Sequence, residues 1–218
     1  MACSGETGSL QTGSSFAAAD SAFYLEAYLD IRTLNRVTRG RSDLGGGGGF
    51  GLQIKAPFSK TLGPPLHHLF FLNFAGYSYT KLAIIDPQPT LNTVALGYGL
   101  QVFPTNSIRI GRAVTPFAQI TGSGVLVYSD RIADEQGTIA NAKTNVRLQY
   151  EVGGGIAGDV RRFASFYAGV FYHNLDNVNY YRVTTAGTET TIDTKKTDLQ
   201  GINIRFGVSL RLVGLVGE

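Results

Sequence analysis

Cysteine, tryptophan and charged residues are scarce in this chain of 218 residues, and each scarcity excludes a class of protein. With the single cysteine Cys3, the chain can form no intramolecular disulfide and no cysteine-based zinc site. Charged residues make up 16% of the chain, below the roughly 25% of ordinary soluble domains. The net charge is only +3, and no Lys/Arg cluster is longer than a pair, so we expect no nucleic-acid partner.

Long hydrophobic runs are also missing. The longest uncharged stretch, residues 87–108, contains three prolines and alternates polar with apolar residues, so it is not a membrane-spanning helix. The first residues, MACSGETGSLQTGSS, lack the basic and apolar segments of a signal peptide. We therefore expect a mature or re-engineered form, or a chain that begins downstream of its true start, and secretion must be argued from the rest of the chain.

What the chain does contain is a period of two. From residue 23 to residue 32, apolar side chains alternate with polar or charged ones, as a strand with two different faces requires. The same alternation recurs along the chain and predicts strands near 22–33, 49–57, 67–80, 91–103, 113–129, 143–157, 163–174 and 198–212. The predicted fold class is all-β: a single antiparallel up-and-down transmembrane β-barrel of about eight strands. We place it at residues 21–213, between a flexible N-terminal tail (1–20) and a short C-terminal tail (214–218).

The connections between these strands differ in length and composition. Long polar stretches follow alternate strands, at 34–48, 81–90, 130–142 and 175–197, and the other connections are generally shorter, most clearly 158–162. Outer-membrane barrels have long extracellular loops and short periplasmic turns. The pattern therefore predicts a contact surface on the long loops.

The placement of charge decides which face meets lipid. The apolar positions of the strands carry hardly any charge, whereas a soluble barrel would need a charged exterior. One Arg or Lys on a lipid face costs roughly 2–4 kcal/mol at the midplane. We therefore expect Leu25, Leu148 and Ile204 to face lipid. Aromatic residues near predicted strand ends are candidates for interfacial girdles; they are Tyr24, Phe50, Phe103, Tyr128, Tyr150, Tyr172 and Tyr180.

The few charges at polar strand positions form a candidate network inside the barrel. They are Glu26, Asp30, Arg32, Lys55, Arg147, Glu151, Arg205 and Arg211. These charges could neutralise one another and plug the interior, which is the interpretation we favour, or they could form a constriction for ions or small solutes. Eight strands leave room for little more than side chains, so a wide pore is not expected.

The last predicted strand carries the most specific motif. The spacing of Arg205, Gly207, Leu210 and Leu212 fits polar-x-Gly-x-x-hydrophobic-x-hydrophobic. In this the chain resembles small bacterial outer-membrane barrels of the OmpA/OmpX/OmpW type, whose last strand bears such a signal for the barrel-assembly machinery. The family favours a terminal aromatic residue, whereas this chain has leucines and continues to Glu218. The resemblance implies location in the bacterial outer membrane, lipid contact and recognition by that machinery.

Two other motifs say less about function. Gly46-x-Gly48-x-x-Gly51 matches a dinucleotide fingerprint only because residues 45–49 are all glycine, and we interpret the run as a flexible loop. His67 and His68 are adjacent, so a strand would place them on opposite faces and they would not chelate one metal ion. They follow two prolines and are expected in a turn at the membrane edge.

Two further residues could carry chemistry. His173 is the best catalytic candidate, of the kind used by lipid-modifying barrel enzymes, but an exposed histidine at the barrel rim without a role is the simpler interpretation. Cys3 resembles the end of a lipoprotein cleavage box without its upstream apolar segment, so lipidation stays an alternative.

The sequence thus predicts an integral outer-membrane barrel with a structural, surface-interaction or narrow-conduit role. We predict no catalytic residues, no metal and no cofactor. Two alternatives stay open: a soluble ligand-binding barrel and a lipid-modifying enzyme.

Overall fold

The computed structural model describes residues 23–35, 44–58, 66–79, 90–103, 114–129, 132–133, 139–140, 144–161, 164–186 and 189–212. Within these ranges, no helix is long and apolar enough to cross a membrane. The predicted tails 1–20 and 214–218, Cys3, and most of the predicted loops 81–90 and 130–142 lie outside the described residues.

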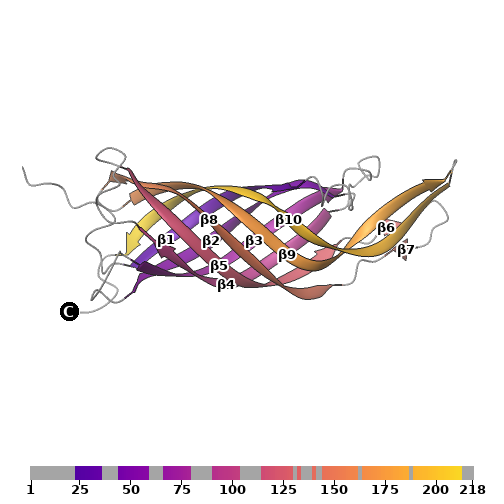
Figure 1. The fold of residues 1–218 in the computed structure, drawn as a ribbon, viewed down its shortest axis with the longest axis horizontal. Helices are drawn as coiled ribbons and strands as arrows, with labels where there is room; N and C mark the ends of the chain where they lie inside the picture. Colours follow the sequence, from indigo (N-terminus) through magenta and orange to yellow (C-terminus); the bar gives the residue numbers. More distant parts are fainter. Residues whose placement is uncertain are drawn as a thin grey trace, which may run out of the picture.

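Eight long strands form a closed barrel in which every neighbouring pair is antiparallel (Figure 1). They are β1 (Phe23–Leu34), β2 (Leu44–Pro57), β3 (Leu66–Tyr79), β4 (Thr90–Val102), β5 (Val114–Ser129), β8 (Asn145–Arg161), β9 (Ala164–Ala186) and β10 (Glu189–Leu212). The short strands β6 (Ile132–Ala133) and β7 (Ile139–Ala140) form a separate two-stranded sheet between β5 and β8. The order around the barrel is β1-β10-β9-β8-β5-β4-β3-β2, so consecutive long strands are neighbours and the first pairs with the last. The prediction of an all-β, up-and-down barrel is therefore confirmed.

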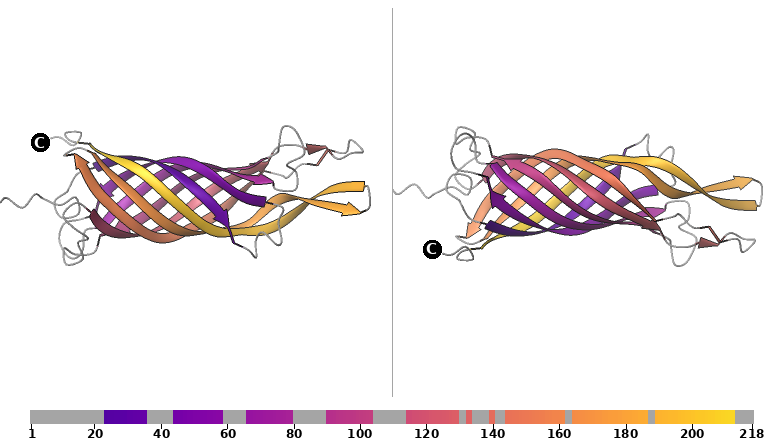
Figure 2. Two further views of the ribbon diagram at one scale, coloured as in Figure 1. Left: turned by 90° about the horizontal axis from the view of Figure 1, so that it is seen from above. Right: turned by 90° about the horizontal axis from the view of Figure 1, so that it is seen from below.

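The two ends of the barrel differ. At one end, here called the terminal end, Phe23 of β1 pairs with Leu212 of β10. At the opposite end, here called the hairpin end, β1 stops at Leu34, which pairs with Gly201 of β10. Strands β9 and β10 continue past this level as a two-stranded ribbon that projects beyond the other strands (Figures 1 and 2).

Apolar side chains cover the outside of the barrel, and polar side chains fill much of the inside. Leu25, Leu148 and Ile204 are 38%, 75% and 37% exposed, whereas Glu26 and Arg205 are only 2% and 3% exposed. A soluble barrel would show the reverse, because its exterior must be solvated and its interior apolar. The exterior is therefore suited to hydrocarbon.

The glycine run is part of the barrel wall, so the expectation of a flexible loop at residues 45–49 was wrong. Strand β2 starts at Leu44, and glycines 47–49 pair with both β1 and β3. A β-carbon added at Gly49 would collide with the Asp30 carboxylate, and one at Gly51 with the Tyr28 ring. Glycine is needed at these two positions because large interior side chains of β1 lie directly over the backbone of β2.

Two of the predicted connections were also wrong. The stretch 175–197, expected as a loop, is mostly strand, because β9 runs to Ala186 and β10 starts at Glu189. Likewise β8 continues to Arg161, so the expected turn at 158–162 is mostly strand. Polar residues mark a strand that has left the membrane as readily as they mark a loop, and alternation alone does not separate the two.

The aromatic girdle was predicted only in part. Phe50, Tyr128, Tyr150 and Tyr172 are exposed on the barrel exterior, but Phe50 pairs with Leu29 in the middle of β1 and so does not lie near a strand end. In contrast, Tyr24, Phe103 and Tyr180 are buried. Tyr24 and Phe103 both lie within cation–π distance of the interior Lys55 ammonium group, so they belong to the barrel interior.

Candidate functional site: a filled lumen and a projecting hairpin

Six of the eight predicted lumen charges are buried inside the barrel: Glu26, Asp30, Arg32, Lys55, Glu151 and Arg205. They come from strands β1, β2, β8 and β10, which is possible because alternate residues of each strand point inward. Three are acidic and three are basic, so these six interior charges balance. Arg147 and Arg211 are half-buried rather than buried.

Near the terminal end, Glu26 and Lys55 form one ion pair. The Lys55 Nζ atom lies 2.8 Å from Glu26 Oε1, and the amide of Gln53 donates a hydrogen bond to the other carboxylate oxygen, Oε2. The ammonium group also faces the rings of Tyr24 and Phe103, with its Nζ atom 4.8 Å and 5.6 Å from their centroids. Both charges are therefore satisfied by protein groups although neither is exposed.

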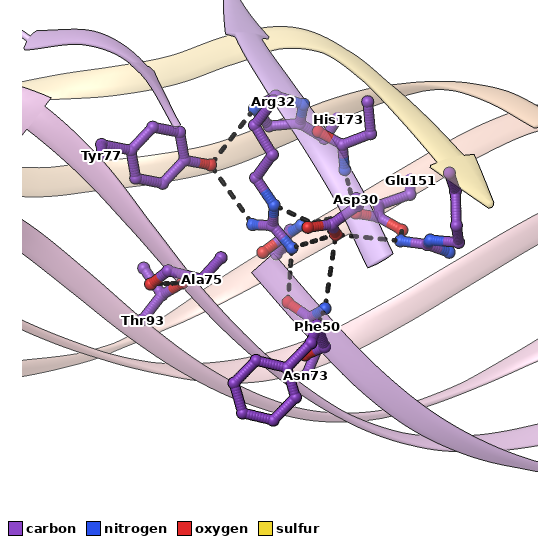
Figure 3. Close-up of polar contacts among 12 residues, drawn as sticks. Asp30, Arg32, Phe50, Asn73, Ala75, Tyr77, Thr93, Glu151 and His173 are labelled. Carbon is purple, nitrogen blue, oxygen red and sulfur yellow. Dashed lines mark hydrogen bonds and ion pairs between the residues drawn. The ribbon is translucent and has the colours of Figure 1, made fainter. Parts of the chain in front are cut away.

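Farther along the lumen, Asp30 and Arg32 form a second cluster (Figure 3). They are two residues apart on β1 and therefore share its inner face; Arg32 Nη2 lies 3.0 Å from Asp30 Oδ2. Arg32 Nη1 donates a 3.3 Å hydrogen bond to the Tyr77 hydroxyl of β3. Asn73 of β3 links both charges, because its Nδ2 donates to Asp30 and its Oδ1 accepts from Arg32.

Glu151 of β8, labelled in Figure 3, and Arg205 of β10 extend this cluster. Arg205 Nη2 lies 2.9 Å from Glu151 Oε2 and 3.7 Å from Asp30 Oδ2, so it bridges two carboxylates. The other Glu151 oxygen accepts hydrogen bonds from Asn203 and Gln149, at 2.7 Å and 2.9 Å. We call these two ion pairs, with Asn73, Tyr77, Gln149, His173 and Asn203, the central network.

An aromatic layer connects the Glu26–Lys55 pair with the central network. It consists of Tyr28, Phe103, Phe117, Ala157, Tyr167 and Phe171, all buried. Ring contacts run from Phe103 to Phe117 (6.0 Å between centroids) and from Phe117 to Phe171 (6.4 Å). Lys55 faces Phe103 at one side of the layer, and the Arg205 guanidinium lies 4.8 Å from the Phe171 centroid at the other. Closely packed rings therefore lie between the two groups of charges.

At the hairpin end, the lumen is apolar. A buried cluster, here called the apolar cap, gathers side chains from seven of the eight long strands. Its members are Leu34, Leu44, Tyr77, Tyr79, Leu91, Ala95, Val125, Val127, Leu175, Val178, Tyr180, Tyr181 and Leu199. An apolar cap stabilises the barrel mouth by hydrophobic burial and offers no ligands to a passing ion.

The sequence prediction found the charges but missed their partners. Tyr77, Asn73 and Asn203 supply hydrogen bonds that the charges need once they are buried, yet the alternation gave no reason to single them out. A usable signal existed for the apolar cap. Val125 and Val127 are separated from the lumen-facing Ser123 by two and four residues, so their side chains also point inward. Apolar residues at these inward positions indicate that the lumen becomes apolar toward the end of β5.

The histidines lie elsewhere than expected. His67 and His68 belong to β3 rather than to a turn, with His67 buried and His68 half-buried. His68 Nδ1 lies 2.6 Å from the hydroxyl oxygen of Tyr98, which is on the exterior. His173 is fully buried, not exposed at the rim, and its Nε2 lies 3.5 Å from the Tyr77 hydroxyl. Among the described residues, no three His, Cys, Asp or Glu side chains gather as a metal site requires.

The predicted assembly signal lies on β10, the strand that closes the barrel against β1. Arg205 points into the lumen, Leu210 is exposed on the exterior, and Leu212 is half-buried at the strand end. Gly207 faces the ring of Tyr167 on β9, which occupies the space that a β-carbon would need. The glycine of the motif therefore has a packing role in the folded barrel.

The second feature of interest is the hairpin, defined here as residues 178–186 of β9 and 189–197 of β10. It is continuous with the barrel wall, and its register runs from Val178 opposite Thr197 to Ala186 opposite Glu189. The exposed residues of its β10 arm are polar or charged, and Lys195 lies 3.7 Å from Asp193 in an exposed ion pair. The described β10 arm of the hairpin is thus a polar edge above the apolar barrel exterior, whereas Val178, Tyr180 and Tyr181 at the base of the β9 arm are buried.

Comparisons with known proteins support the fold. No family model matches the chain, and no curated protein matches it in sequence. Among solved structures, it is similar to a major outer membrane protein from Thermus thermophilus (12% identity, TM-score 0.51, 88% of this chain and 98% of that chain). It is also similar to outer membrane protein AlkL in lipid bilayers (13% identity, TM-score 0.50, 91% and 93% covered). Neisserial surface protein A gives 16% identity and a TM-score of 0.49, with 87% and 97% covered.

The similarities to the Thermus protein and to AlkL cover almost the whole of each chain, and at such low identity they establish the fold only. The fold is that of small bacterial outer-membrane β-barrels. Together with the apolar exterior, this agrees with the predicted location in the bacterial outer membrane. A more specific OmpA, OmpX or OmpW relationship rests on the motif of the last strand alone.

Proposed function

We propose that the chain is an integral outer-membrane protein whose barrel is a closed anchor and whose hairpin is the contact surface for a partner outside the cell. The observation that carries this proposal is the filled lumen. An ion pair, an aromatic layer, a charge-balanced network and an apolar cap follow one another inside the barrel. In the part of the chain that the structure describes, this sequence of layers favours the neutral plug over the conduit.

The orientation follows from the general architecture of such barrels. Their longer connections are extracellular and their termini are periplasmic. With Phe23 and Leu212 in the periplasm, the hairpin projects outside the cell. Its polar arm gives a surface for contacts above the membrane, where the sequence predicts long loops.

The closed lumen is tested by electrical recording. Full-length protein reconstituted into planar bilayers should show no conductance steps, and Glu151→Gln and Arg147→Gln should stay silent because the aromatic layer and apolar cap persist. Regular single-channel steps that change when Glu151 or Arg147 is neutralised would instead support the conduit.

The contact role is tested by trimming the hairpin. Residues 182–193, which lie above the buried base and begin at the Arg182–Asp193 pair, are replaced by a short turn, and cells displaying the trimmed or full chain are compared for aggregation and surface adhesion. The matched control keeps the hairpin and changes the lipid-facing Val146 to Ala. Loss of binding in the trimmed chain alone supports the proposal; unchanged binding assigns the contacts elsewhere.

This proposal includes no catalytic step and no cofactor. The position of His173 supports a protein without a catalytic step. This histidine is fully buried and contacts Tyr77 inside the lumen, so a lipid at the barrel surface does not reach it. His173→Ala should therefore abolish no lipid-modifying activity. Such a loss would support the enzyme alternative.

We also retain the last strand as the proposed signal for the barrel-assembly machinery. Arg205, Gly207, Leu210 and Leu212 lie on the strand that joins β1 to complete the barrel, where a late recognition step would act. Leu210→Asp should slow assembly in cells more than it slows refolding of purified protein in detergent. Equal effects in both assays would indicate a general folding defect.

A further inference from the structure

The hairpin continues the barrel wall, and its base also contacts the opposite wall of the barrel. Tyr181 of β9 contacts Tyr79 of β3, with ring centroids 5.5 Å apart. The Tyr181 backbone N–H also donates a 3.2 Å hydrogen bond to the Tyr79 hydroxyl. Strands β9 and β3 are four places apart in the ring of eight, so this contact joins opposite walls.

The hairpin base is also part of the apolar cap. Val178, Tyr180 and Tyr181 are buried, and they pack with residues such as Leu91 and Val127 that line the mouth from β4 and β5. The Tyr79 hydroxyl has a second neighbour, Ser129 Oγ at 3.4 Å, so Tyr79 contacts both the hairpin and β5. The side chains of the hairpin base therefore cover the outer part of the lumen.

The bend that allows this lies immediately below the base. The register of β9 and β10 shifts there, so Asp176 and Asn177 together oppose the single residue Asp198. Asn177 has a φ of 53°, a left-handed conformation that asparagine tolerates better than most residues. Its backbone N–H donates a 2.9 Å hydrogen bond to Asp198 Oδ1. Such a β-bulge bends and twists the strand that contains it.

Support from neighbouring strands also ends near this bulge. Below it, β9 pairs with both β8 and β10, up to Leu175 opposite Gln149. Above it, the strand pairs in the described part of the chain join β9 and β10 only to each other. A two-stranded ribbon alone is marginally stable. The contacts at Tyr79, together with packing in the apolar cap, therefore hold the base over the mouth.

We propose that the base of the hairpin is a hinged lid over the barrel mouth, with the Asn177–Asp198 bulge as its hinge and the Tyr79–Tyr181 contact as its latch. The lid opens as a unit while the barrel stays folded. Opening exposes the apolar cap to water but leaves the aromatic layer and the central network closed. This proposal does not depend on what the hairpin binds.

The absence of tryptophan gives a direct test of the latch. A Tyr181→Trp variant of the full chain, in detergent micelles or nanodiscs, carries one fluorophore at the latch. Its quenching by aqueous iodide is measured with Tyr79 intact and with Tyr79→Ala added. The matched control instead adds Tyr128→Ala. This change removes a tyrosine on the barrel exterior, at the hairpin end of β5.

With a latch, iodide quenching rises several-fold in the Tyr79→Ala background and stays unchanged with Tyr128→Ala, while boiling-dependent gel mobility shows an intact barrel in both. Equal quenching in all three proteins overturns the latch. Full quenching when Tyr79 is intact, in a barrel that is folded, overturns the closed lid.

Hydrogen exchange tests the same contact without tryptophan. Tyr79→Phe keeps the ring but removes the hydroxyl that accepts from the Tyr181 N–H. Exchange at that amide should accelerate at least tenfold, with amides of β1 unchanged. An unchanged rate at Tyr181 counts against the latch.

The hinge is tested at Asn177. Asn177→Gly permits the left-handed conformation, whereas Asn177→Val disfavours it. In the Tyr181→Trp background, the valine variant should be quenched more than the glycine variant. Identical quenching in the two variants removes the bulge from the proposal.

Discussion

Among single residues, Glu151 has the most demanding position. Its two oxygens accept from Arg205, Asn203 and Gln149 inside the barrel. Removing one partner of a buried ion pair leaves an uncompensated charge and costs roughly 3–5 kcal/mol, whereas exposed pairs are worth about 0–1 kcal/mol. We therefore expect Glu151→Ala to lower the free energy of unfolding by several kcal/mol.

The matched control for this change is Asp193→Ala, which breaks the exposed ion pair with Lys195 on the hairpin. Urea unfolding in lipid vesicles measures both variants. A loss no larger for Glu151→Ala than for Asp193→Ala would show that the lumen is hydrated enough to screen the charges.

A second prediction concerns Gly207, where the neighbouring side chain leaves no room for a β-carbon. A β-carbon there would overlap the Tyr167 ring and crowd the Ala27 carbonyl, so Gly207→Ala should cost about 1–3 kcal/mol as other overpacked sites do. Gly122→Ala is the control, because a β-carbon at Gly122 meets no atom within 4 Å. Thermal gel-shift midpoints compare the two variants, and equal midpoints would contradict the packing role.

The sequence was informative about individual charges and less so about their surroundings. Alternation on β1 was enough to predict that Glu26, Asp30 and Arg32 share the inner face. The alternation did not show that His173 is buried. A polar sequence at this point is typical both of a strand that continues and of a loop that begins, so the pattern does not separate the two. Which strands face each other across the lumen depends on barrel closure, which no local pattern contains.

For the strands, the main question is where β10 leaves the membrane. Ile204 and Thr194 lie on the same strand, but Ile204 is on the barrel exterior and Thr194 is on the hairpin. Ile204→Arg should cost about 2–4 kcal/mol if it lies near the bilayer midplane, whereas Thr194→Arg should cost little. Refolding into vesicles measures both, and similar costs would place the membrane boundary elsewhere.

The strand assignments show what periodicity can and cannot predict. The eight long strands were found because each has one apolar face that must meet lipid, and this constraint is visible at every second residue. Outside the membrane the constraint is absent, and so the polar sequence of the hairpin arms of β9 and β10 predicts a loop instead of strands. The glycine run of β2 was missed because glycine has no side chain to alternate.

For the whole molecule, the fold predicts resistance to detergent. A closed barrel leaves no free strand edge in its wall, so it should stay folded in dodecyl sulfate at room temperature and unfold only on boiling. The unboiled protein should therefore migrate faster in a gel than the boiled protein. One band position under both conditions, or solubility in plain buffer, would contradict the membrane barrel.

The central claim is that apolar side chains face acyl chains while the lumen is closed to them, and brominated lipid tests it most directly. Leu148→Trp places a single tryptophan on the exterior, and Phe171→Trp places one in the aromatic layer. In vesicles of lipids brominated along the acyl chain, the tryptophan of Leu148→Trp should be strongly quenched and that of Phe171→Trp should not. Quenching at Phe171→Trp without quenching at Leu148→Trp would show that the barrel is inside out.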